Sequence, residues 1–272
     1  MITNEYGLEE RQHKLLELAK DVDKIMRKNG IVYSLCGGTL LGAIRHDGFI
    51  PWDDDLDIML DRENYEKLIR LFKGGAGTVK IRGVGEDGKE NVREYVLRRK
   101  LWVYSIHRKD VTDSSGNLIF TDVFVMDNCP DNNAVRKAKV FAVKTLQGMM
   151  HESLEPEGKS LGGKVLLAGT YVLGRFFPDR VKFRMYENVS QIGNKSKTEY
   201  ITGYYDLFKL LNCRYTGRLF DNIIYHKFED TKLPIIAEYD NYLTVQYGDY
   251  MTPPDTKERI PMHQEDHSDL YR

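Results

Sequence analysis

The sequence of 272 residues contains no long hydrophobic run, and its strongest apolar stretch, residues 165–177, is interrupted by Arg175. A membrane-spanning helix needs roughly 20 apolar residues, so this stretch does not span. The N-terminus is charged and lacks the apolar core of a signal peptide. We expect a cytoplasmic protein in which residues 165–177 form a core helix or, as the second interpretation, a helix resting on a membrane surface.

Cysteine is scarce as well. The three cysteines, Cys36, Cys129 and Cys213, are odd in number and far apart, and no CxxC pair occurs. This spacing indicates neither a zinc site nor a disulfide framework. A reducing compartment agrees with the expected cytoplasmic setting.

The chain has no excess of one charge, since 40 basic residues oppose 41 acidic ones. A dedicated nucleic-acid binder usually carries a strong basic excess, so we expect no nucleic-acid partner. Residues 134–184 depart from this balance, with ten Lys or Arg against four acidic residues. That local excess suits an anionic substrate or a membrane surface, and a solvated helix face explains it equally well.

Hydrophobic periodicity and turn residues predict an α+β protein, with a nucleotidyltransferase-like mixed sheet flanked by helices and a helical, basic second half. We expect residues 1–130 to form the catalytic core and residues 131–272 a helical or mixed extension that completes the same domain. The expected helices cover residues 8–28, a short segment capped by Thr39 that runs to Ile44, the segment capped by Asp61 that runs to Phe72, 133–151 and 161–192. The expected strands cover residues 31–35, 56–60, 79–84, 95–106, 118–126 and 200–204, with a hairpin turn at 113–117.

Four aspartates within residues 53–57 stand directly before an apolar strand. Strand alternation places Leu56 and Ile58 on a core face and Asp55 and Asp57 together on the other face, about 7 Å apart. Carboxylates this close repel each other unless a cation lies between them. Oxygen ligands favour Mg²⁺ or Mn²⁺, so we expect one of these ions as cofactor.

Three kinds of site compete for this acidic motif. An EF-hand loop beginning at Asp53 fails, because Ile58 and Asn64 stand where Gly and Glu are required. The DxD motif of a sugar-nucleotide glycosyltransferase normally follows a nucleotide-binding βαβ region, whereas one strand precedes Asp55 here. A nucleotidyltransferase pattern, in which a strand ends in Gly-Gly before a short helix and an Asp-x-Asp strand, matches Gly37-Gly38 and Asp55-Leu56-Asp57. An exposed acidic turn is the structural alternative.

Three stretches of the chain resemble the LicD/fukutin-type family. The family has a GGTLLG-like turn followed by an RH-GF-IPWDDD-D-like stretch. Here these are Gly37-Gly38-Thr39-Leu40-Leu41-Gly42, Arg45-His46, Gly48-Phe49 and Ile50-Pro51-Trp52-Asp53-Asp54-Asp55 with Asp57. Residues 120–127, FTDVFVMD, resemble the family's FIDIFPLD strand, with Val125 where proline is usual. Residues 247–254, YGDYMTPP, resemble its C-terminal YGDYM segment. The resemblance is dense over residues 30–60 and patchy elsewhere.

This resemblance implies a nucleotidyltransferase-like fold and transfer of a phosphorylated alcohol from a CDP-linked donor to a glycan hydroxyl. Bacterial members typically use CDP-choline and modify teichoic acid or lipopolysaccharide precursors, whereas relatives use CDP-ribitol or similar donors. For this chain it implies a phosphocholine-type transferase that releases CMP. A glycosyltransferase that uses a sugar nucleotide and a non-catalytic metal- or nucleotide-binding protein are the alternatives.

In-line phosphoryl transfer requires cations that neutralise the diphosphate and a group that orients the attacking hydroxyl. We expect Asp55 and Asp57 to bind the metal. Asp122, on a neighbouring strand, is expected to bind metal or accept the acceptor's proton, with an ordinary strand-end Asp as the alternative. Asp53 and Asp54 are expected to orient the first pair.

The donor's phosphates need hydrogen-bond donors and positive charge. Gly37, Gly38 and Thr39 open a short helix whose free N–H groups bind phosphate. Arg45 is a candidate phosphate clamp, with an ordinary surface arginine as the alternative. Four residues of the strand near position 100 alternate onto one face, which is expected to meet the donor diphosphate or to be simply exposed. They are Arg98, Lys100, Trp102 and Tyr104.

Two further expectations concern the ends of the substrates. A choline head group requires aromatic rings around its quaternary ammonium, and Trp52 and Trp102 are the candidates. His46 is expected to be structural. The basic residues 134–184, with their apolar stretch, are expected to hold a lipid-linked glycan acceptor in peripheral contact with the inner face of the membrane.

Overall fold

The computed structural model describes residues 2–3, 5–73, 77–84, 90–151, 161–195, 198–205 and 210–261. Helices and strands both occur throughout these residues, so the expected α+β class is confirmed. The chain forms two compact units. The first combines Met1–Val125 with Leu219–Arg272, and the second is Met126–Arg218. The first unit is thus built from two segments that the second unit separates in the sequence.

The first unit opens with a long amphipathic helix, α1 (Glu9–Lys28). Its buried residues include Leu15, Leu18 and Val22, at the three- and four-residue spacing of one helix face. The helix ends at Asn29-Gly30, where Gly30 adopts a left-handed φ of +60°. The helix expected over residues 8–28 is therefore confirmed.

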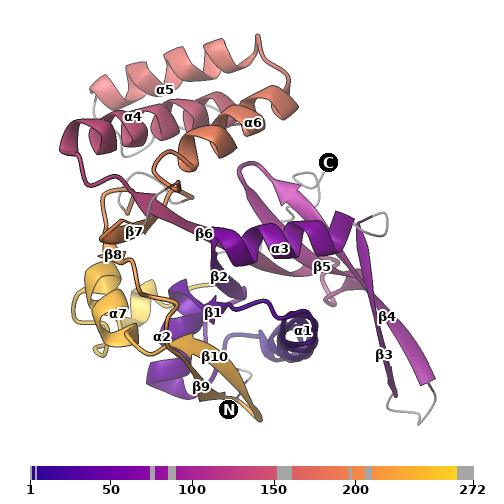
Figure 1. The fold of residues 1–272 in the computed structure, drawn as a ribbon. Helices are drawn as coiled ribbons and strands as arrows, with labels where there is room; N and C mark the ends of the chain where they lie inside the picture. The colour runs from indigo at the N-terminus through magenta and orange to yellow at the C-terminus, as the bar shows by residue number, and fades with distance from the viewer. Residues whose placement is uncertain are drawn as a thin grey trace. The chain divides into compact units, whose positions relative to one another are not determined.

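A strand–helix–strand segment follows α1 (Figure 1). Its elements are β1 (Ser34–Leu35), α2 (Gly37–His46), β2 (Asp57–Asp61) and the following helix α3 (Arg62–Lys73). The expected cap of α3 is confirmed, since Asp61 Oδ1 accepts a hydrogen bond from the Asn64 N–H at 2.8 Å. The expected cap at Thr39 is wrong. Glycine tolerates the left-handed backbone at the start of α2, so this helix begins three residues earlier than expected, with Cys36 at the cap position and Thr39 in the first turn.

Four longer strands extend the sheet of the first unit. They are β3 (Thr78–Val84), β4 (Glu90–Lys100), β5 (Val103–Thr112) and β6 (Leu118–Cys129), of which residues 118–125 belong to this unit. Strands β3 to β6 pair antiparallel in sequence order. The order across the unit is β1-β2-β6-β5-β4-β3, so β6 lies next to the strand that follows the acidic motif.

The single strand expected over residues 95–106 is wrong. β4 ends at Lys100 and β5 begins at Val103, with Leu101 and Trp102 in the turn between them. Leu101 adopts a left-handed φ of +51°, a conformation that tight hairpin turns use and that Gly or Asn usually supplies. Because the chain reverses here, Tyr104 pairs with Arg99 and does not share the face of Arg98.

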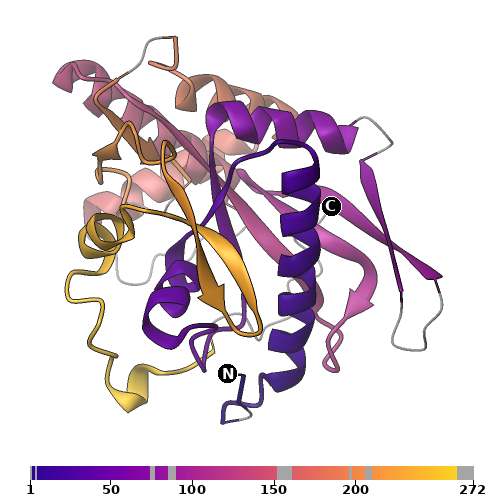
Figure 2. The ribbon, with the colours of Figure 1, turned by 60° about the horizontal axis from the view of Figure 1, so that its bottom comes forward.

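After the second unit, the chain returns to the first. The returning elements are β9 (Ile223–Phe228), β10 (Thr231–Ile236), α7 (Tyr239–Tyr247) and the short 3-10 helix η1 (Thr256–Glu258). The β9–β10 hairpin lies beside α1 (Figure 2), and the Ile236 N–H donates to Ser34 Oγ at 3.0 Å. α7 contacts α2. Segments from near both ends of the sequence therefore surround the strand–helix–strand segment.

The second unit is mainly helical. It contains residues 126–129 of β6, α4 (Asn133–Met150), α5 (Leu161–Gly174), α6 (Asp179–Ser190), β7 (Tyr200–Gly203) and β8 (Tyr215–Thr216). The single helix expected over residues 161–192 is wrong, because Pro178 cannot occupy a helix interior and instead caps the start of α6. Within the described part of the chain, no helix is long and apolar enough to cross a membrane.

α2 and the loop after it approach each other closely at Gly42. A Cβ added to Gly42 would lie 2.5 Å from the Gly48 carbonyl oxygen and 3.1 Å from the Ile50 nitrogen. These are backbone atoms, so no side-chain rotation relieves the clash. We predict that Gly42→Ala lowers the free energy of unfolding by about 2–4 kcal/mol, measured by urea unfolding and circular dichroism, despite the higher helix propensity of alanine.

Gly169 in α5 provides the matched control. No atom lies within 4 Å of a Cβ added there. Gly169→Ala should therefore raise the free energy of unfolding by up to about 1 kcal/mol, through helix propensity alone. Equal stability of the two variants would contradict the close approach at Gly42.

Candidate active site

Backbone hydrogen bonds tie the acidic stretch before β2 to the start of α2. Residues 53–56 have no regular secondary structure, and Asp57 is the first residue of β2. The Asp57 N–H donates to Thr39 Oγ1 at 2.9 Å, and the Asp57 carbonyl accepts from the Cys36 N–H at 3.2 Å. The acidic stretch therefore cannot shift relative to α2 without breaking both hydrogen bonds.

Two carboxylates lie directly against the glycines that begin α2. A Cβ added to Gly37 would be 3.1 Å from Asp57 Oδ2, and one added to Gly38 would be 2.8 Å from Asp53 Oδ2. Gly37 also has a φ of +55°, which other residues rarely adopt. The N-terminus of a helix carries partial positive charge, so α2 stabilises the carboxylates that its glycines admit.

The aspartates before β2 repel one another. Burial raises the pKa of Asp53 well above its usual range, the neighbouring Asp55 and Asp54 raise it further, and Arg45 lowers it. Asp53 Oδ2 is buried, and no donor among the described residues forms a hydrogen bond with it. A divalent cation at this position would remove the repulsion and satisfy the buried oxygen.

The residues at this site fit a cation that also contacts a bound ligand. Among the residues that the structure describes, no three His, Cys, Asp or Glu side chains are already grouped around a metal position. Mg²⁺ is usually held by one or two carboxylates, while water and substrate phosphates complete its coordination. Asp55 and Asp57 would supply the protein's share of such a site. A metal bond from Asp122 stays a prediction.

Asp122 lies on the strand next to the acidic stretch. Its N–H donates to the carbonyl of Leu56, between Asp55 and Asp57, at 2.9 Å. Thr121 Oγ1 donates to the same carbonyl at 2.8 Å. The Asp122 carboxylate accepts a hydrogen bond from the buried Ser105 hydroxyl, which fixes its orientation. β6 therefore places the backbone of Asp122 directly beside the residue between Asp55 and Asp57.

Arg98 lies in the same row across the sheet as Asp122. Arg98 pairs with Ser105 across β4 and β5, and Ser105 pairs with Asp122 across β5 and β6. Paired residues on neighbouring strands project from the same face, so the Cα atoms of Arg98 and Asp122 are about 10 Å apart. The Arg98 side chain is exposed, whereas that of Lys100 lies outside the described residues.

Comparison with known proteins finds a family similarity. Residues 30–139 match the family model "LicD/FKTN/FKRP, nucleotidyltransferase domain". This part of the chain is therefore similar to the LicD family. The matched region contains α2, the acidic stretch and the strand that carries Asp122, which are the elements that the structure brings together.

Two similar proteins have named activities. The chain is 25% identical over 271 residues to the lipopolysaccharide cholinephosphotransferase LicD of Haemophilus influenzae, covering 94% of this chain and 96% of that protein. It is 40% identical over 65 residues to the human ribitol 5-phosphate transferase FKRP, covering 24% of this chain and 13% of FKRP. An uncharacterized protein of Rickettsia prowazekii, RP689, is 31% identical over 123 residues, covering 43% of this chain and 41% of that protein.

Tyr247, at the end of α7, lies at the site and was not assigned by motif reasoning. Its hydroxyl lies 4.0 Å from the position of a Cβ on Gly37. Burial of the hydroxyl end raises the pKa of Tyr247 above its usual range, and Asp57 is the largest of the nearby charges that raise it further. The neutral phenol can donate a hydrogen bond at the site, although 44% of the residue is exposed. The YGDYM-like stretch was the only sequence signal for it.

The C-terminal segment also holds Arg45 in place. Arg45 Nη1 donates to the Tyr250 carbonyl at 2.9 Å, and Arg259 Nε donates to the Pro254 carbonyl at 3.0 Å. Burial, followed by the neighbouring Arg259, lowers the pKa of Arg45. Two guanidinium groups therefore lie near each other beside the acidic stretch, an arrangement that suits a phosphate.

The two tryptophans that were candidates for a choline cage have different surroundings. The Trp52 ring meets Tyr6 edge-on at 5.8 Å and His46 edge-on at 6.2 Å between ring centres. The guanidinium carbon of Arg259 lies 5.2 Å from the Trp52 ring centre, so this ring already contacts a cation. Trp102 lies in the β4–β5 turn and is 7% exposed, which leaves little of its surface for a ligand.

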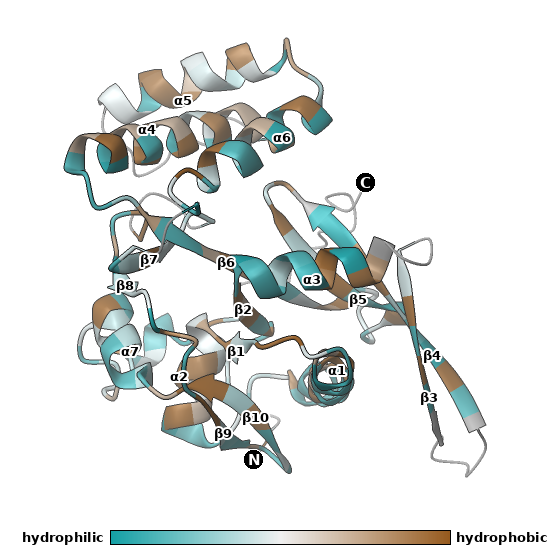
Figure 3. Ribbon diagram, viewed as in Figure 1, coloured by the Kyte–Doolittle hydropathy of each residue, from teal (hydrophilic) through white to brown (hydrophobic). Residues whose placement is uncertain are grey.

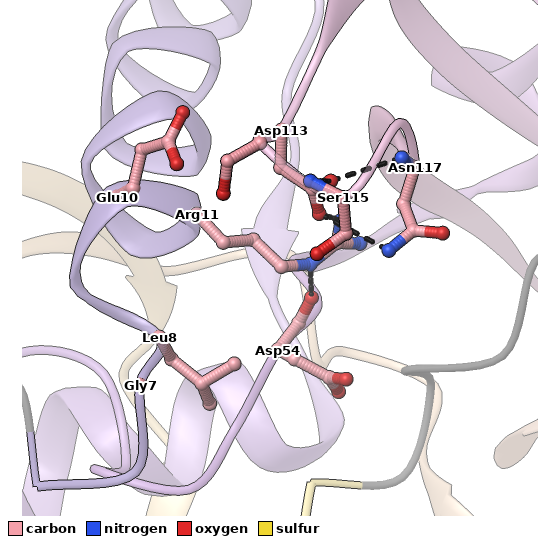
Figure 4. Close-up of a pocket in the computed structure, with 9 residues that line it drawn as sticks. Gly7, Leu8, Glu10, Arg11, Asp54, Asp113, Ser115 and Asn117 are labelled. Carbon is pink, nitrogen blue, oxygen red and sulfur yellow. Dashed lines mark hydrogen bonds and ion pairs between the residues drawn. The ribbon is translucent and has the colours of Figure 1, made fainter.

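Two side chains of α1 form hydrogen bonds with the backbone of the acidic stretch, and sequence reasoning missed these contacts as well. Arg11 Nε donates to the Asp54 carbonyl at 2.5 Å, and Gln12 Nε2 donates to the Asp53 carbonyl at 2.9 Å. Figure 4 shows Arg11 lying between Asp54 and the turn after β5, where Nη1 forms an ion pair with Asp113 at 2.8 Å. The available signal was the position of these polar residues, one turn before Leu15 and Leu16 on the buried helix face.

Thr39 gives a test of how the acidic stretch is held. Thr39→Val keeps the shape of the side chain but leaves the Asp57 N–H without its acceptor. We predict that it lowers the free energy of unfolding by about 1–3 kcal/mol. Mg²⁺ affinity, measured by isothermal titration calorimetry, should fall about tenfold because the metal-binding carboxylates lose their support. Thr39→Ser retains the acceptor and should behave as wild type, whereas identical losses in both variants would contradict this role.

Proposed function

We propose that this chain transfers phosphocholine from CDP-choline to a hydroxyl of a cell-surface glycan precursor, such as teichoic acid or lipopolysaccharide, and releases CMP. The observation that carries the proposal is that Asp57 and Asp53 lie against the glycines that begin α2, with Asp55 beside Asp53 and the strand of Asp122 hydrogen-bonded to the acidic stretch. The similarity to a lipopolysaccharide cholinephosphotransferase over nearly the whole chain supports the same reaction class.

The donor's diphosphate would lie against the N-terminus of α2. Asp55 and Asp57 would hold Mg²⁺ or Mn²⁺, which when bound neutralises the diphosphate charge. Backbone N–H groups of Gly38 and Thr39 are the hydrogen-bond donors of the helix start. Arg45 supplies positive charge from the other end of the same helix, and Arg98 supplies it from the sheet.

The transfer itself requires one base and one leaving group. The oxygen of the acceptor hydroxyl attacks the phosphorus that carries choline, and its proton passes to the Asp122 carboxylate. The bond from that phosphorus to the bridging oxygen of the diphosphate breaks, and CMP leaves with the bridging oxygen and its electron pair. The hydrogen bond from Ser105 supports this role, because it orients the Asp122 carboxylate that receives the proton.

The similarity to ribitol 5-phosphate transferases favours one alternative donor, a CDP-linked polyol such as CDP-ribitol. Ribitol carries no charge, whereas choline carries a quaternary ammonium that favours an aromatic face. The Trp52 ring already contacts the Arg259 guanidinium, so a choline head group would bind the other face of the ring or replace that contact. With a lipid-linked acceptor, the enzyme would work from the cytoplasm at the inner face of the membrane.

Asp55→Asn tests the proposed chemistry. Losing this carboxylate should lower Mg²⁺-dependent CMP release from CDP-choline by about a hundredfold to a thousandfold, with the circular dichroism spectrum unchanged. EDTA should abolish release from the wild type, and added Mg²⁺ should restore it. Asp221→Asn, at an exposed position, is the matched control and should retain full turnover. Unchanged turnover in Asp55→Asn would remove the proposed metal site.

Trp52→Leu tests the identity of the donor. Loss of the aromatic face should raise the KM for CDP-choline about tenfold and leave the KM for CDP-ribitol nearly unchanged. Trp52→Phe keeps a ring and should lie between wild type and Trp52→Leu. The measurement is CMP release over a series of donor concentrations. Equal increases for both donors would show that Trp52 supports the fold of the site and does not recognise choline.

A further inference from the structure

The outer surface of the second unit is unusually apolar. Eleven of the nineteen large hydrophobic residues that are exposed in the described part of the chain lie between Val135 and Ile192. Soluble proteins rarely expose large contiguous apolar patches without a binding partner. Six of these residues belong to α5 and the turn after it, and they define what we call the α5 face. They are Val165, Leu166, Val172, Leu173, Phe176 and Phe177.

Many residues of α5 are apolar, as the brown segments in Figure 3 show, and the burial pattern places them on two opposite sides of the helix. Its inner side carries Leu167, Thr170 and Gly174, which are buried. A Cβ added to Gly174 would lie 2.1 Å from the Met149 carbonyl oxygen, so α5 packs tightly on α4. A helix that is hydrophobic on all sides belongs in a core or in lipid, and the inner side alone already satisfies the core of this unit.

The exposed residues of α5 lie together on its other side. Val165, Leu166, Val172 and Leu173 have the spacing of a single helix face. Phe176, in the turn that follows, is 77% exposed. On α6, Val181 and Met185 are also exposed, one helical turn apart.

Cations accompany these apolar residues. From residue 161 to residue 192 the sequence has five Lys or Arg and two acidic residues, Asp179 and Glu187. Asp179 already forms an ion pair with Lys182 at 2.7 Å. The exposed cations that stand between the apolar residues are Lys164, Arg175, Arg180 and Arg184. Mixed apolar and cationic side chains fit an anionic lipid surface, where the former enter the acyl boundary and the latter contact head groups.

The end of α5 has the chemistry of a membrane interface. Arg175 Nη2 donates to the Tyr171 hydroxyl at 2.5 Å, and its guanidinium carbon lies 4.9 Å from the centre of the Tyr171 ring. Tyrosine and arginine are typical of the zone between acyl chains and water. At 14 residues, α5 is about 21 Å long and too short to span roughly 30 Å of hydrocarbon, so it would lie in the interface.

We propose that the α5 face and the cations beside it bind the surface of an anionic lipid membrane. This inference depends on the second unit alone, so it stands or fails separately from the proposed transfer reaction. The test is flotation of the full chain with vesicles of equal parts phosphatidylcholine and phosphatidylglycerol. The wild type should float with these vesicles, float far less with phosphatidylcholine alone, and dissociate as salt is raised.

Two variants separate the contributions. Lys164→Glu with Arg175→Glu and Arg180→Glu should lower vesicle partitioning about a hundredfold. Leu173→Ser with Phe176→Ser should lower it about tenfold or more at every lipid composition. The charge-matched control changes three exposed cations elsewhere, Lys28→Glu, Arg82→Glu and Arg218→Glu, and should float as the wild type does. Circular dichroism of each variant confirms that it is folded.

Three outcomes would overturn the proposal. The first is a wild type that does not float, and the second is an α5-face variant that floats as well as the wild type. In the third, light scattering shows that the wild type is a dimer and that the variant with Leu173→Ser and Phe176→Ser is a monomer, while flotation is the same for both. That result would assign the surface to a second copy of the chain.

Discussion

The site depends on holding like charges side by side at the start of one helix. Burial raises the pKa of Asp53, and the neighbouring Asp55 and Asp54 raise it further because like charges repel, so this stretch needs a firmly held backbone. The hydrogen bond from the Asp57 N–H to Thr39 Oγ1 holds it on one side. On the other side, Arg11 and Gln12 of α1 hold the carbonyls of Asp54 and Asp53. The backbone of the acidic stretch is therefore held in place by hydrogen bonds with side chains of α1 and α2.

The part of the site that lies close together in the sequence could be predicted. Gly37 and Asp57 are separated by one short helix and one loop, so the nucleotidyltransferase pattern of a Gly-Gly turn, a short helix and an Asp-x-Asp strand was sufficient to place them together. The β4–β5 turn could not be predicted, because Leu101 adopts a left-handed conformation without the Gly or Asn that normally marks it. The break between α5 and α6 could have been predicted from Pro178, because proline is unfavourable inside a helix. The apolar pattern around Pro178 led to the prediction of a single helix instead.

The part that is distant in the sequence could not be predicted from local pattern. Periodicity places Arg11 on the buried face of α1, but only the folded chain shows that it meets Asp54, 43 residues away. Tyr247 and Arg259 reach the same site through the returning C-terminal segment, which follows the whole second unit. Motif resemblance marked the stretch that contains Tyr247, yet it gave no physical reason for that residue to approach Gly37. Such contacts depend on the topology of the whole chain, which local propensity does not predict.

Two buried lysines of the second unit support the inference that its apolar exterior is suited to a lipid surface. Lys139 is buried and donates to the carbonyls of Asn128 at 2.9 Å and Ile192 at 2.8 Å, with its ammonium 3.8 Å from the centre of the Tyr204 ring. Lys182 is buried as well and donates to the Met149 carbonyl at 3.2 Å. Burial of ammonium groups is unfavourable unless carbonyls and rings compensate it, as they do here. The second unit thus has two lysines in its interior and two phenylalanines, Phe176 and Phe177, on its surface, which is the reverse of the usual distribution. Water alone would not favour that distribution, whereas a lipid surface would favour the outward aromatic and aliphatic side chains.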